Sequence, residues 1–224
     1  MFKFFMRKNF DQICIEKVNK LSDLNKRNGF KVFDSAQEIE SWTTSSFPDF
    51  YKMSYKETLT SSINIRKAVY GYAGNCHIAV NQYLRGIDSN LTNPTKLIID
   101  NINGAMEVNC TPDNIVVYRT DDFKGLLCKS NNKKIRVGGF LSDPAFLSTT
   151  LLKNNRIKWA EHQNICERVL LIIELPKGTK CISASNISAA SSEYELILKS
   201  NSEIEVLDIL YRKGHNYILY CRAK

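Results

Sequence analysis

The sequence predicts an α+β domain, because helical patterns fill the first half of the chain and short β-rich runs fill the second half. Helices followed by strands, rather than alternating with them, are typical of sheets that pack together with helices to one side. The length of 224 residues suits one large domain, or one domain with an N-terminal extension, around a single hydrophobic core.

The helical half shows two start signals and one amphipathic segment. Residues 35–38 and 54–57 both read S-x-x-E, the capping box in which a hydroxyl and a carboxylate satisfy free N–H groups at a helix start. Residues 77–85 carry apolar side chains at helical spacing, and Asn81 and Arg85 stand four positions apart. We therefore expect helices from about residues 35 and 54, and a third whose Asn81 and Arg85 share a face.

The second half predicts a series of short strands. Their β-branched and aromatic runs are residues 115–118, 169–175, 194–198, 203–210 and 217–221. Lys213-Gly214-His215-Asn216 is typical of the turn in a closing hairpin. Residues 101–104 and 129–134 are expected to be loops, because Asn, Gly and Lys cluster there.

Charge and cysteine usage narrow the functional classes. With 31 Lys and Arg against 23 Asp and Glu, the net charge of +8 favours an acidic partner, whether an anionic cofactor, an acidic protein, nucleic acid or a membrane surface. The 7 cysteines are odd in number and form no C-x-x-C pair, so neither a disulfide framework nor a zinc site is indicated. Reduced thiols in a cytosol are expected.

The N-terminus and the remaining histidines carry no clear signal. Residues 1–8 are basic and aromatic, but charges interrupt them before they reach signal-peptide length, and no apolar run is long enough to span a membrane. A secretion or localisation segment and a frayed end both stay open. His162 and His215 have no partner at metal or triad spacing, and no metal site is predicted.

Glu193-Tyr194-Glu195 is the first candidate for chemistry. A small, polar segment leads into these residues, and an apolar run follows them. In a strand, residues i and i+2 point the same way, so Glu193 and Glu195 would stand side by side. Two adjacent carboxylates repel each other, which favours a cation or a chemical task nearby. The structural alternative is a solvated strand edge.

Two further segments are weak alone. Phe146-Leu147-Ser148-Thr149-Thr150 is a hydroxyl cluster after apolar residues and is typical of a strand end. Val116-Val117-Tyr118-Arg119 is an apolar strand that ends in an arginine. Such an arginine is usually a surface residue, yet its fork of donors also suits a diphosphate.

Taken in order, these segments resemble a known family. Arg119, then Ser148-Thr149-Thr150, then Glu193-x-Glu195 resembles the R-S-E class of mono-ADP-ribosyltransferases, specifically the bacterial exoenzyme and binary-toxin branch. The resemblance runs from about Phe33 to the end of the chain and includes the aromatic-rich N-x-Y-L-R segment at residues 81–85. It implies a split NAD-binding core of two packed, mainly antiparallel sheets, with helices from about residues 35–90 alongside.

The resemblance also implies catalytic roles. Arg119 would grip a phosphate of NAD and orient the nicotinamide ribose, and Ser148 would position the catalytic glutamate. Glu195 would hold the ribose 2′-hydroxyl and stabilise the oxocarbenium-like transition state as nicotinamide departs. Glu193 would orient and deprotonate the acceptor, and a carboxylate there resembles the arginine-modifying members.

The implied cofactor contacts come from other segments, and some depart from the family pattern. Tyr72, Asn81, Arg85, Thr149 and Arg156 are expected to contact NAD, together with Arg119. The last residue of the usual S-T-S is Thr150, and His77 stands where a tyrosine is expected. The loop after Thr150 is short and lacks the expected phenylalanine, so Trp159 or Tyr72 would supply its aromatic surface and Arg156 its arginine. Ala189-Ala190 replaces an aromatic that often touches the target.

The implied function is transfer of ADP-ribose from NAD to a side chain of a target protein, with arginine favoured and a hydroxyl acceptor such as threonine open. NAD acts as a substrate, and no G-x-G-x-x-G or P-loop is present to hold it in the dinucleotide-fold manner. The alternatives are an NAD glycohydrolase and a non-catalytic basic binding module on the same fold.

The expected setting is that of a bacterial toxin or effector, secreted and acting in the host cytosol. Actin, small GTPases and ubiquitin are general candidates for the target, and neither nucleic-acid binding nor stable membrane insertion is expected. Residues 1–32 are predicted to be an N-terminal extension that could carry a secretion or localisation segment. Residues 33–224 are predicted to be the catalytic domain.

Overall fold

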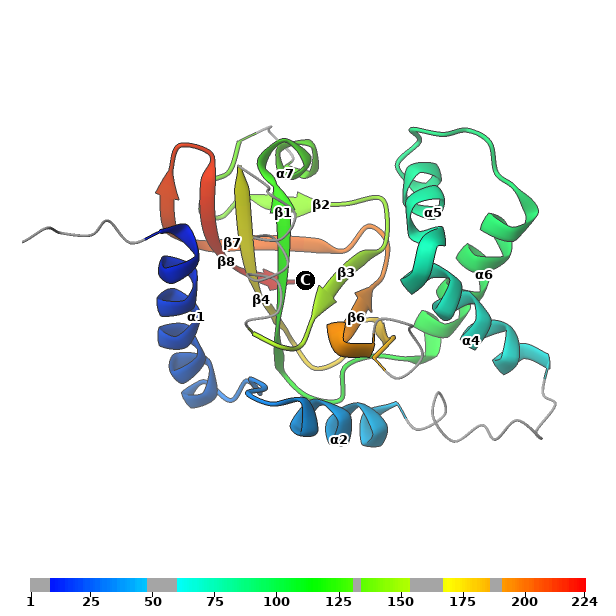
Figure 1. Cartoon of the computed structure of the whole chain (residues 1–224), viewed down its shortest axis with the longest axis horizontal. Helices are drawn as coiled ribbons and strands as arrows, with labels where there is room; N and C mark the ends of the chain where they lie inside the picture. The colour runs from blue at the N-terminus through cyan, green and yellow to red at the C-terminus, as the bar shows by residue number, and fades with distance from the viewer. Residues whose placement is uncertain (1–8, 48–59, 131–133, 154–166, 186–190) are drawn as a thin grey trace, which may run out of the picture.

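A computed structural model gives the structure of residues 9–47, 60–130, 134–153, 167–185 and 191–224. Within these ranges the chain forms one eight-stranded sheet in the order β2-β7-β8-β4-β1-β3-β6-β5, flanked by helices (Figure 1). The strands are β1 (Ile115–Asp122), β2 (Phe140–Ser142), β3 (Leu147–Thr150), β4 (Arg168–Leu175), β5 (Cys181–Ser183), β6 (Glu195–Leu198), β7 (Glu203–Lys213) and β8 (Asn216–Ala223).

The sheet has two halves that meet at a single pairing. Between β1 and β3, Tyr118 pairs with Thr150, whereas β1 pairs with β4 along its whole length. Among the described strands only β4 and β8 run parallel, so the sheet is mainly antiparallel as expected. The α+β class is confirmed. The sequence analysis predicted two packed sheets, but the pairing of Tyr118 with Thr150 joins the two halves into one sheet.

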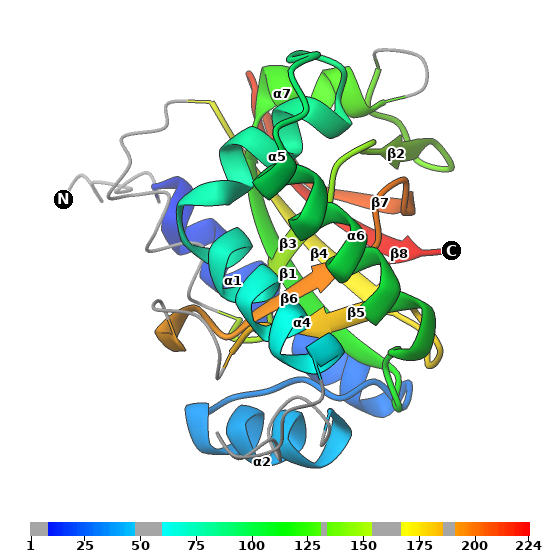
Figure 2. The ribbon, with the colours of Figure 1, turned by 90° about the vertical axis from the view of Figure 1, so that its right-hand side faces the viewer.

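Three helices cover the face of the sheet that carries the main core. They are α4 (Thr60–Gly71), α5 (His77–Leu84) and α6 (Asn93–Val108), and the π-helical segment η1 (Tyr72–Cys76) joins the first two. Figure 2 views the molecule from this side, with α4, α5 and α6 in front of the strands. Ile102 and Met106 of α6 are fully buried in the same core as Leu196 and Ile197 of β6.

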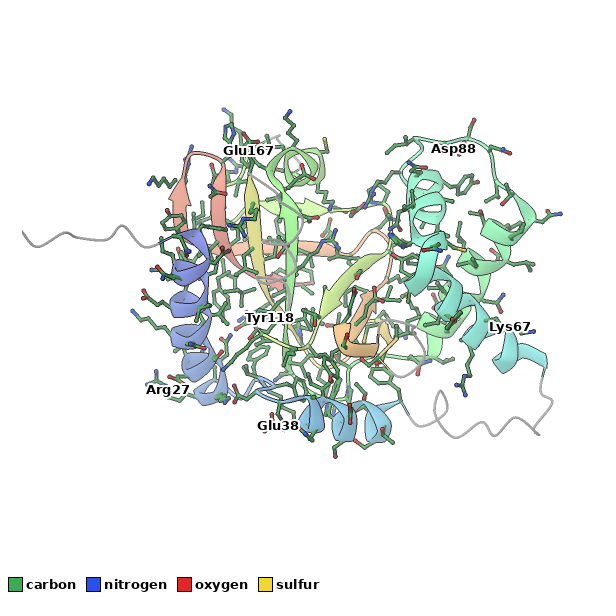
Figure 3. All side chains as sticks on the ribbon, viewed as in Figure 1. Arg27, Glu38, Lys67, Asp88, Tyr118 and Glu167 are labelled. Carbon is green, nitrogen blue, oxygen red and sulfur yellow. The ribbon has the colours of Figure 1, made fainter. Side chains whose placement is uncertain are left out.

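Helix α1 (Phe10–Arg27) packs on the opposite face of the sheet. Cys14, Val18 and Leu21 form a second core there with Tyr118, which is 1% exposed. Figure 3 labels Tyr118 among the side chains of this part of the molecule. Helices therefore lie on both faces. Although α1 falls within the predicted extension, it is packed on the sheet.

Helix α2 (Ala36–Ser46) begins where the capping box predicted. The hydroxyl of Ser35 accepts a hydrogen bond from the backbone N–H of Glu38 at 3.3 Å. The Glu38 carboxylate accepts from the N–H of Asp34, one residue before the expected donor. Residues 54–57, the second predicted capping box, lie outside the described residues.

The predicted strands are confirmed, with small shifts at their ends. β7 and β8 form the closing hairpin, and the two residues between them are Gly214 and His215. Gly214 has φ +58°, a left-handed conformation that glycine adopts without steric cost. The turn chemistry of the sequence therefore located this hairpin correctly.

The loop predicted at residues 101–104 is wrong, because these residues lie inside α6. Asn103 and Gly104 are typical turn residues, but Ile99, Ile102 and Met106 recur at helical spacing and are buried. Burial of this face outweighs the low helix propensity of two residues. The other predicted loop, 129–134, begins inside α7 (Phe123–Lys129), a helix capped by Asp122 that the sequence analysis missed, and its residues 131–133 lie outside the described residues.

The described cysteines carry free thiols. Cys14, Cys181 and Cys221 are buried, and burial raises the pKa of the Cys14 thiol to about 12. Such thiols stay protonated near neutral pH and are poor nucleophiles. Cys166 lies outside the described residues.

Candidate active site

Arg119 and Ser148 come together where β1 and β3 meet. The Nη1 of Arg119 donates to the backbone carbonyl oxygen of Ser148 at 2.7 Å. Its Nε and Nη2 donate to the two carboxylate oxygens of Asp121 at 2.9 and 2.8 Å. The side chain is only 16% exposed. Two hydrogen bonds to the Asp121 carboxylate and one to the Ser148 carbonyl therefore fix the plane of the guanidinium.

Asp121 carries negative charge between two cations. Lys129, at the end of α7, donates to its carboxylate at 3.0 Å. Burial by itself would raise the pKa of Asp121, but the charges of Arg119 and Lys129 outweigh burial and hold this pKa well below its ordinary value of 3.8. The carboxylate is therefore ionised at any physiological pH.

Arg85 is held in a similar way by Asp143. Arg85 caps the C-terminal end of α5, and its Nε and Nη2 donate to the two carboxylate oxygens of Asp143 at 2.9 and 2.8 Å. Asp143 also accepts from the backbone N–H of Ala145 at 3.0 Å, and it lies 3.2 Å from the Lys129 ammonium. Burial would raise the pKa of Asp143, but Arg85 and Lys129 keep it below 3.8. This carboxylate, too, is ionised.

Lys129 thereby joins two arginine–carboxylate pairs into one network, which we call the cationic network. Its members are Arg85, Asp143, Lys129, Asp121 and Arg119. Three cations against two carboxylates leave one excess positive charge. The two arginines come from different layers, one from a helix and one from the sheet. Such a network is suited to holding two guanidinium groups beside a phosphorylated ligand.

The π-helical segment brings Tyr72 and Asn81 together. In a straight α-helix, residues nine positions apart lie about 13 Å apart along the axis and on opposite sides. Here Gly74 has non-helical angles (φ −86°, ψ −116°), and the chain bends. Asn81 Nδ2 therefore donates to the Tyr72 hydroxyl at 3.2 Å. The hydroxyl in turn donates to the carbonyl oxygen of Phe146 at 3.4 Å. A π-helical bulge of this kind is frequent at functional sites.

Tyr72 connects the helical side of the site with Glu195. Burial raises the pKa of the Tyr72 phenol, and the negative charge of Glu195 raises it further. The Asn81 hydrogen bond and the charges of Arg119 and Arg85 oppose this rise. The charges of Arg85, Arg119 and Glu195 therefore all act on one buried tyrosine.

Ser148 and Glu195 lie on adjacent strands. In the antiparallel pair of β3 and β6, Ser148 is opposite Ile197 and Thr150 is opposite Glu195. Directly opposed residues share a face, and so do residues i and i+2, so Ser148 and Glu195 project from one face as diagonal neighbours. Thr149 is fully buried, and its hydroxyl donates to the carbonyl oxygen of Leu196 at 2.7 Å. This bond ties the two strands together.

Glu193 and Glu195 do not share a strand, which corrects the expected geometry. Glu193 ends the 3-10 helix η2 (Ser191–Glu193), whereas Glu195 is the first residue of β6. Tyr194 between them has φ +48°, in the left-handed region. The alternation of an extended strand therefore does not apply at these positions. Glu195 is 7% exposed, and Glu193 is half-buried.

A sequence model described as ADP-ribosyltransferase exoenzyme matches residues 39–221 of the chain. The chain belongs to the ADP-ribosyltransferase exoenzyme family. The protein is accordingly an NAD-dependent ADP-ribosyltransferase, and NAD is its substrate. No curated protein sequence matches it significantly.

Solved structures of ADP-ribosyltransferases share this fold. The Clostridium limosum C3 exoenzyme superposes with a TM-score of 0.65 at 19% identity, covering 87% of this chain and 97% of that chain. C3stau2 from S. aureus with NAD gives 0.64 at 18% identity, covering 88% and 99%. BECa, from a binary enterotoxin of C. perfringens, was solved with NADH and gives 0.64 at 20% identity, covering 88% and 50%. At these identities the likeness shows the fold alone.

Several predicted site residues of the transferase fall outside the described part of the chain. Arg156 and Trp159 lie between residues 153 and 167. His162, for which no role was predicted, and Ala189-Ala190, which replaces the expected aromatic, also lie outside it. Among the described residues, no group of three or more His, Cys, Asp or Glu side chains could hold a metal ion. None of the described helices is both long and apolar enough to cross a membrane.

The sequence analysis missed three residues of the transferase site, namely Asp121, Lys129 and Asp143. For Asp121 a signal existed, because residues i and i+2 of a strand share a face and the sequence reads R-x-D from Arg119. Lys129 lies in a segment taken for a loop. Asp143 follows β2 and meets Arg85 only through the tertiary fold.

Proposed function

We propose that the enzyme transfers ADP-ribose from NAD to a side chain of a target protein, with arginine as the favoured acceptor. The bond from Arg119 to the Ser148 carbonyl, with Glu195 diagonal to Ser148 on the adjacent strand, is the observation that supports this most directly. Two guanidinium groups would meet the diphosphate of NAD, and a carboxylate would meet the ribose next to the bond that breaks. Asn81, which bonds Tyr72, would contact the cofactor from the same side.

The cationic network supports the proposed binding mode. Its excess positive charge complements the two negative charges of the NAD diphosphate. Arg119 uses three of its five N–H donors on Asp121 and Ser148, so its plane is set before a ligand arrives. A fixed donor costs less conformational entropy on binding than a mobile one. Arg119 and Arg85 are the proposed phosphate contacts, with Arg156 as a further proposed cofactor contact, whereas the fully buried hydroxyl of Thr149 bonds the Leu196 carbonyl instead.

The proposed reaction breaks one glycosidic bond and forms another. The bond between ribose C1′ and the nicotinamide nitrogen breaks, and nicotinamide leaves as a neutral ring with the electron pair. Positive charge develops on the ribose, and Glu195 stabilises it electrostatically. Ser148 would position this glutamate from the adjacent strand. A nitrogen of the acceptor guanidinium then bonds to C1′, and the proton that it loses passes to Glu193.

The acceptor is the part of the proposal that depends on Glu193. A carboxylate can orient and deprotonate a guanidinium, which supports arginine over a hydroxyl acceptor such as threonine. If no protein acceptor is used, water attacks C1′ instead, and the enzyme is an NAD glycohydrolase. The half-buried position of Glu193, beside the more buried Glu195, supports a role towards an incoming partner.

The family supports the proposed setting. Residues 33–224 are the proposed catalytic domain, and the family match at 39–221 lies inside it. Residues 1–32 are the proposed extension. We infer a secreted bacterial toxin or effector that acts on a protein in the host cytosol. Actin, a small GTPase or a ubiquitin-like protein is the proposed class of target, and neither nucleic acid nor stable membrane insertion takes part.

The test is incubation of the purified protein with NAD labelled in the adenylate moiety, with and without a eukaryotic lysate. Label that enters protein, together with released nicotinamide, is the expected result. Label that appears only as free ADP-ribose would make the enzyme a glycohydrolase, and no turnover would contradict the proposal. Neutral hydroxylamine then reports the acceptor, because an arginine adduct should be released and a linkage to a serine or threonine hydroxyl should resist.

A further inference from the structure

Tyr194 occupies a backbone conformation that tyrosine rarely adopts. Its φ of +48° lies in the left-handed region, and the other non-glycine residue with positive φ in the described chain is an asparagine, Asn201. Asparagine visits this region readily, whereas for bulky side chains it is an outlier. Such strained residues persist where the surrounding structure enforces them, and they cluster at functional sites.

Hydrogen bonds enforce the conformation of this segment. Each of the three consecutive carbonyl oxygens from residue 193 to residue 195 accepts a bond from a neighbouring strand or loop. The donors are, in order, Thr150 Oγ1 at 2.6 Å, the Leu151 N–H at 3.1 Å and the Ala184 N–H at 2.9 Å. The half-buried Tyr194 ring also packs against the main core. The backbone is therefore held on both sides of the strained residue.

The strained residue separates the two glutamates. Before it, Glu193 ends a 3-10 helix, and after it, Glu195 begins β6. With an extended residue at position 194, both carboxylates would leave the same face of one strand. The left-handed turn at Tyr194 breaks this alternation. The relative direction of the two carboxylates therefore depends on the backbone at Tyr194.

We propose that Tyr194 is a positioning residue whose left-handed backbone, rather than its hydroxyl or its ring, orients Glu193 relative to Glu195 and so sets the ratio of protein transfer to NAD hydrolysis. The proposal rests on the function proposed above. Hydrolysis needs the charge of Glu195 at the breaking bond and a water molecule. Transfer also needs Glu193 in the correct place to receive the proton of the acceptor. A change in backbone at residue 194 should therefore affect transfer more than hydrolysis.

The test compares Tyr194→Asn with Tyr194→Val. Both variants lack the ring and the phenolic hydroxyl, but asparagine tolerates a left-handed backbone and a β-branched valine does not. For each variant, labelling of protein and release of nicotinamide are measured side by side, and Tyr194→Phe serves as the conservative control. We expect the ratio of transfer to hydrolysis in Tyr194→Val to fall about tenfold below that in Tyr194→Asn, with Tyr194→Phe close to the wild-type ratio.

Three outcomes would overturn the proposal. Equal ratios in the asparagine and valine variants would show that the backbone conformation does not matter. A transfer-to-hydrolysis ratio that falls equally in these two variants but stays at the wild-type value in Tyr194→Phe would assign the effect to the ring. A ratio that falls below the wild-type value in Tyr194→Phe would assign the effect to the hydroxyl.

If Tyr194→Val does not fold, Tyr194→Gly and Tyr194→Ala replace the pair, because they differ only by the β-carbon that disfavours positive φ. A lower ratio in Tyr194→Ala than in Tyr194→Gly would support the proposal, and equal ratios would contradict it. Failure of the proposed function is distinct, since the wild-type protein would then label no protein at all.

Discussion

Arg119 donates from its Nη1 to the carbonyl oxygen of Ser148 at 2.7 Å, which joins two residues that stand 29 positions apart in the chain. This contact lies where the two halves of the sheet meet, close to the single pairing of Tyr118 with Thr150. Displacement of either half would therefore move the proposed phosphate contact relative to the proposed catalytic glutamate. The pairing of the strands thus fixes the position of the site.

Arg119→Lys should weaken the use of NAD strongly. An ammonium cannot bond both oxygens of Asp121 and the Ser148 carbonyl in one plane, as the guanidinium does. We expect kcat/KM for NAD to fall by about 10²-fold, the scale for one lost electrostatic contact in an active site. Steady-state release of nicotinamide measures it. The exposed Arg136→Lys serves as the matched control, and an unchanged kcat/KM in Arg119→Lys would contradict the assignment.

Asp121→Asn should loosen Arg119 without removing it. The amide offers one acceptor oxygen in place of two, and its NH2 group would face the cations of Arg119 and Lys129. We expect KM for NAD to rise about tenfold, which corresponds to the loss of one hydrogen bond to a charged group. Asp100→Asn, on the exposed surface of α6, is the control. Equal KM values in the two variants would show that Asp121 does not orient the arginine.

Asp143→Asn gives a pH-dependent prediction. The pKa of Asp143 is lower in the folded protein than its ordinary value of 3.8, so its charge stabilises the fold at every pH above that value. This stabilisation is lost as the pH falls from about 4 through the lower folded pKa. The variant should therefore melt several degrees below the wild type from pH 8 to pH 5. The difference should shrink below about pH 4. Melting temperatures that stay equal at neutral pH would contradict a stabilising role for this pair.

Gly214→Ala should affect stability but not catalysis. The φ of +58° at the β7–β8 turn disfavours a β-carbon, although no heavy atom would be within 4 Å of it. The expected cost is about 1 kcal/mol, or roughly 2–4 °C in Tm for a chain of this size. Thermal unfolding and nicotinamide release measure the two effects separately. A loss of turnover in a folded Gly214→Ala protein would mean that the hairpin reaches the site.

Local patterns predicted much of this fold. The capping hydroxyl of Ser35, the β-branched and aromatic runs of the strands and the Gly214 turn each depend on neighbouring residues alone, so the sequence reveals them. The failure at residues 101–104 has the opposite cause, because burial of α6 against the sheet outweighs the turn preference of Asn103 and Gly104. Such burial depends on segments that are distant in the chain.

The residues of the site, like the elements of the fold, include some that the sequence predicts and some that it does not. The resemblance predicted Arg119, Ser148 and Glu195, and the structure gathers them where β1, β3 and β6 adjoin. It could not reveal Asp143, whose partner Arg85 lies 58 positions away. Nor could the strand pattern reveal the left-handed backbone of Tyr194, because three hydrogen bonds from other segments hold it.

The most direct test of the account is nicotinamide release from NAD by the wild type and by Glu195→Gln and Glu193→Gln, with protein labelling recorded in parallel. Since Glu195 is proposed to stabilise the charge formed as the glycosidic bond breaks, Glu195→Gln should lower both nicotinamide release and labelling by about 10²-fold or more. Glu193→Gln should lose labelling while slow nicotinamide release survives. Full nicotinamide release by a folded Glu195→Gln protein would contradict the central claim.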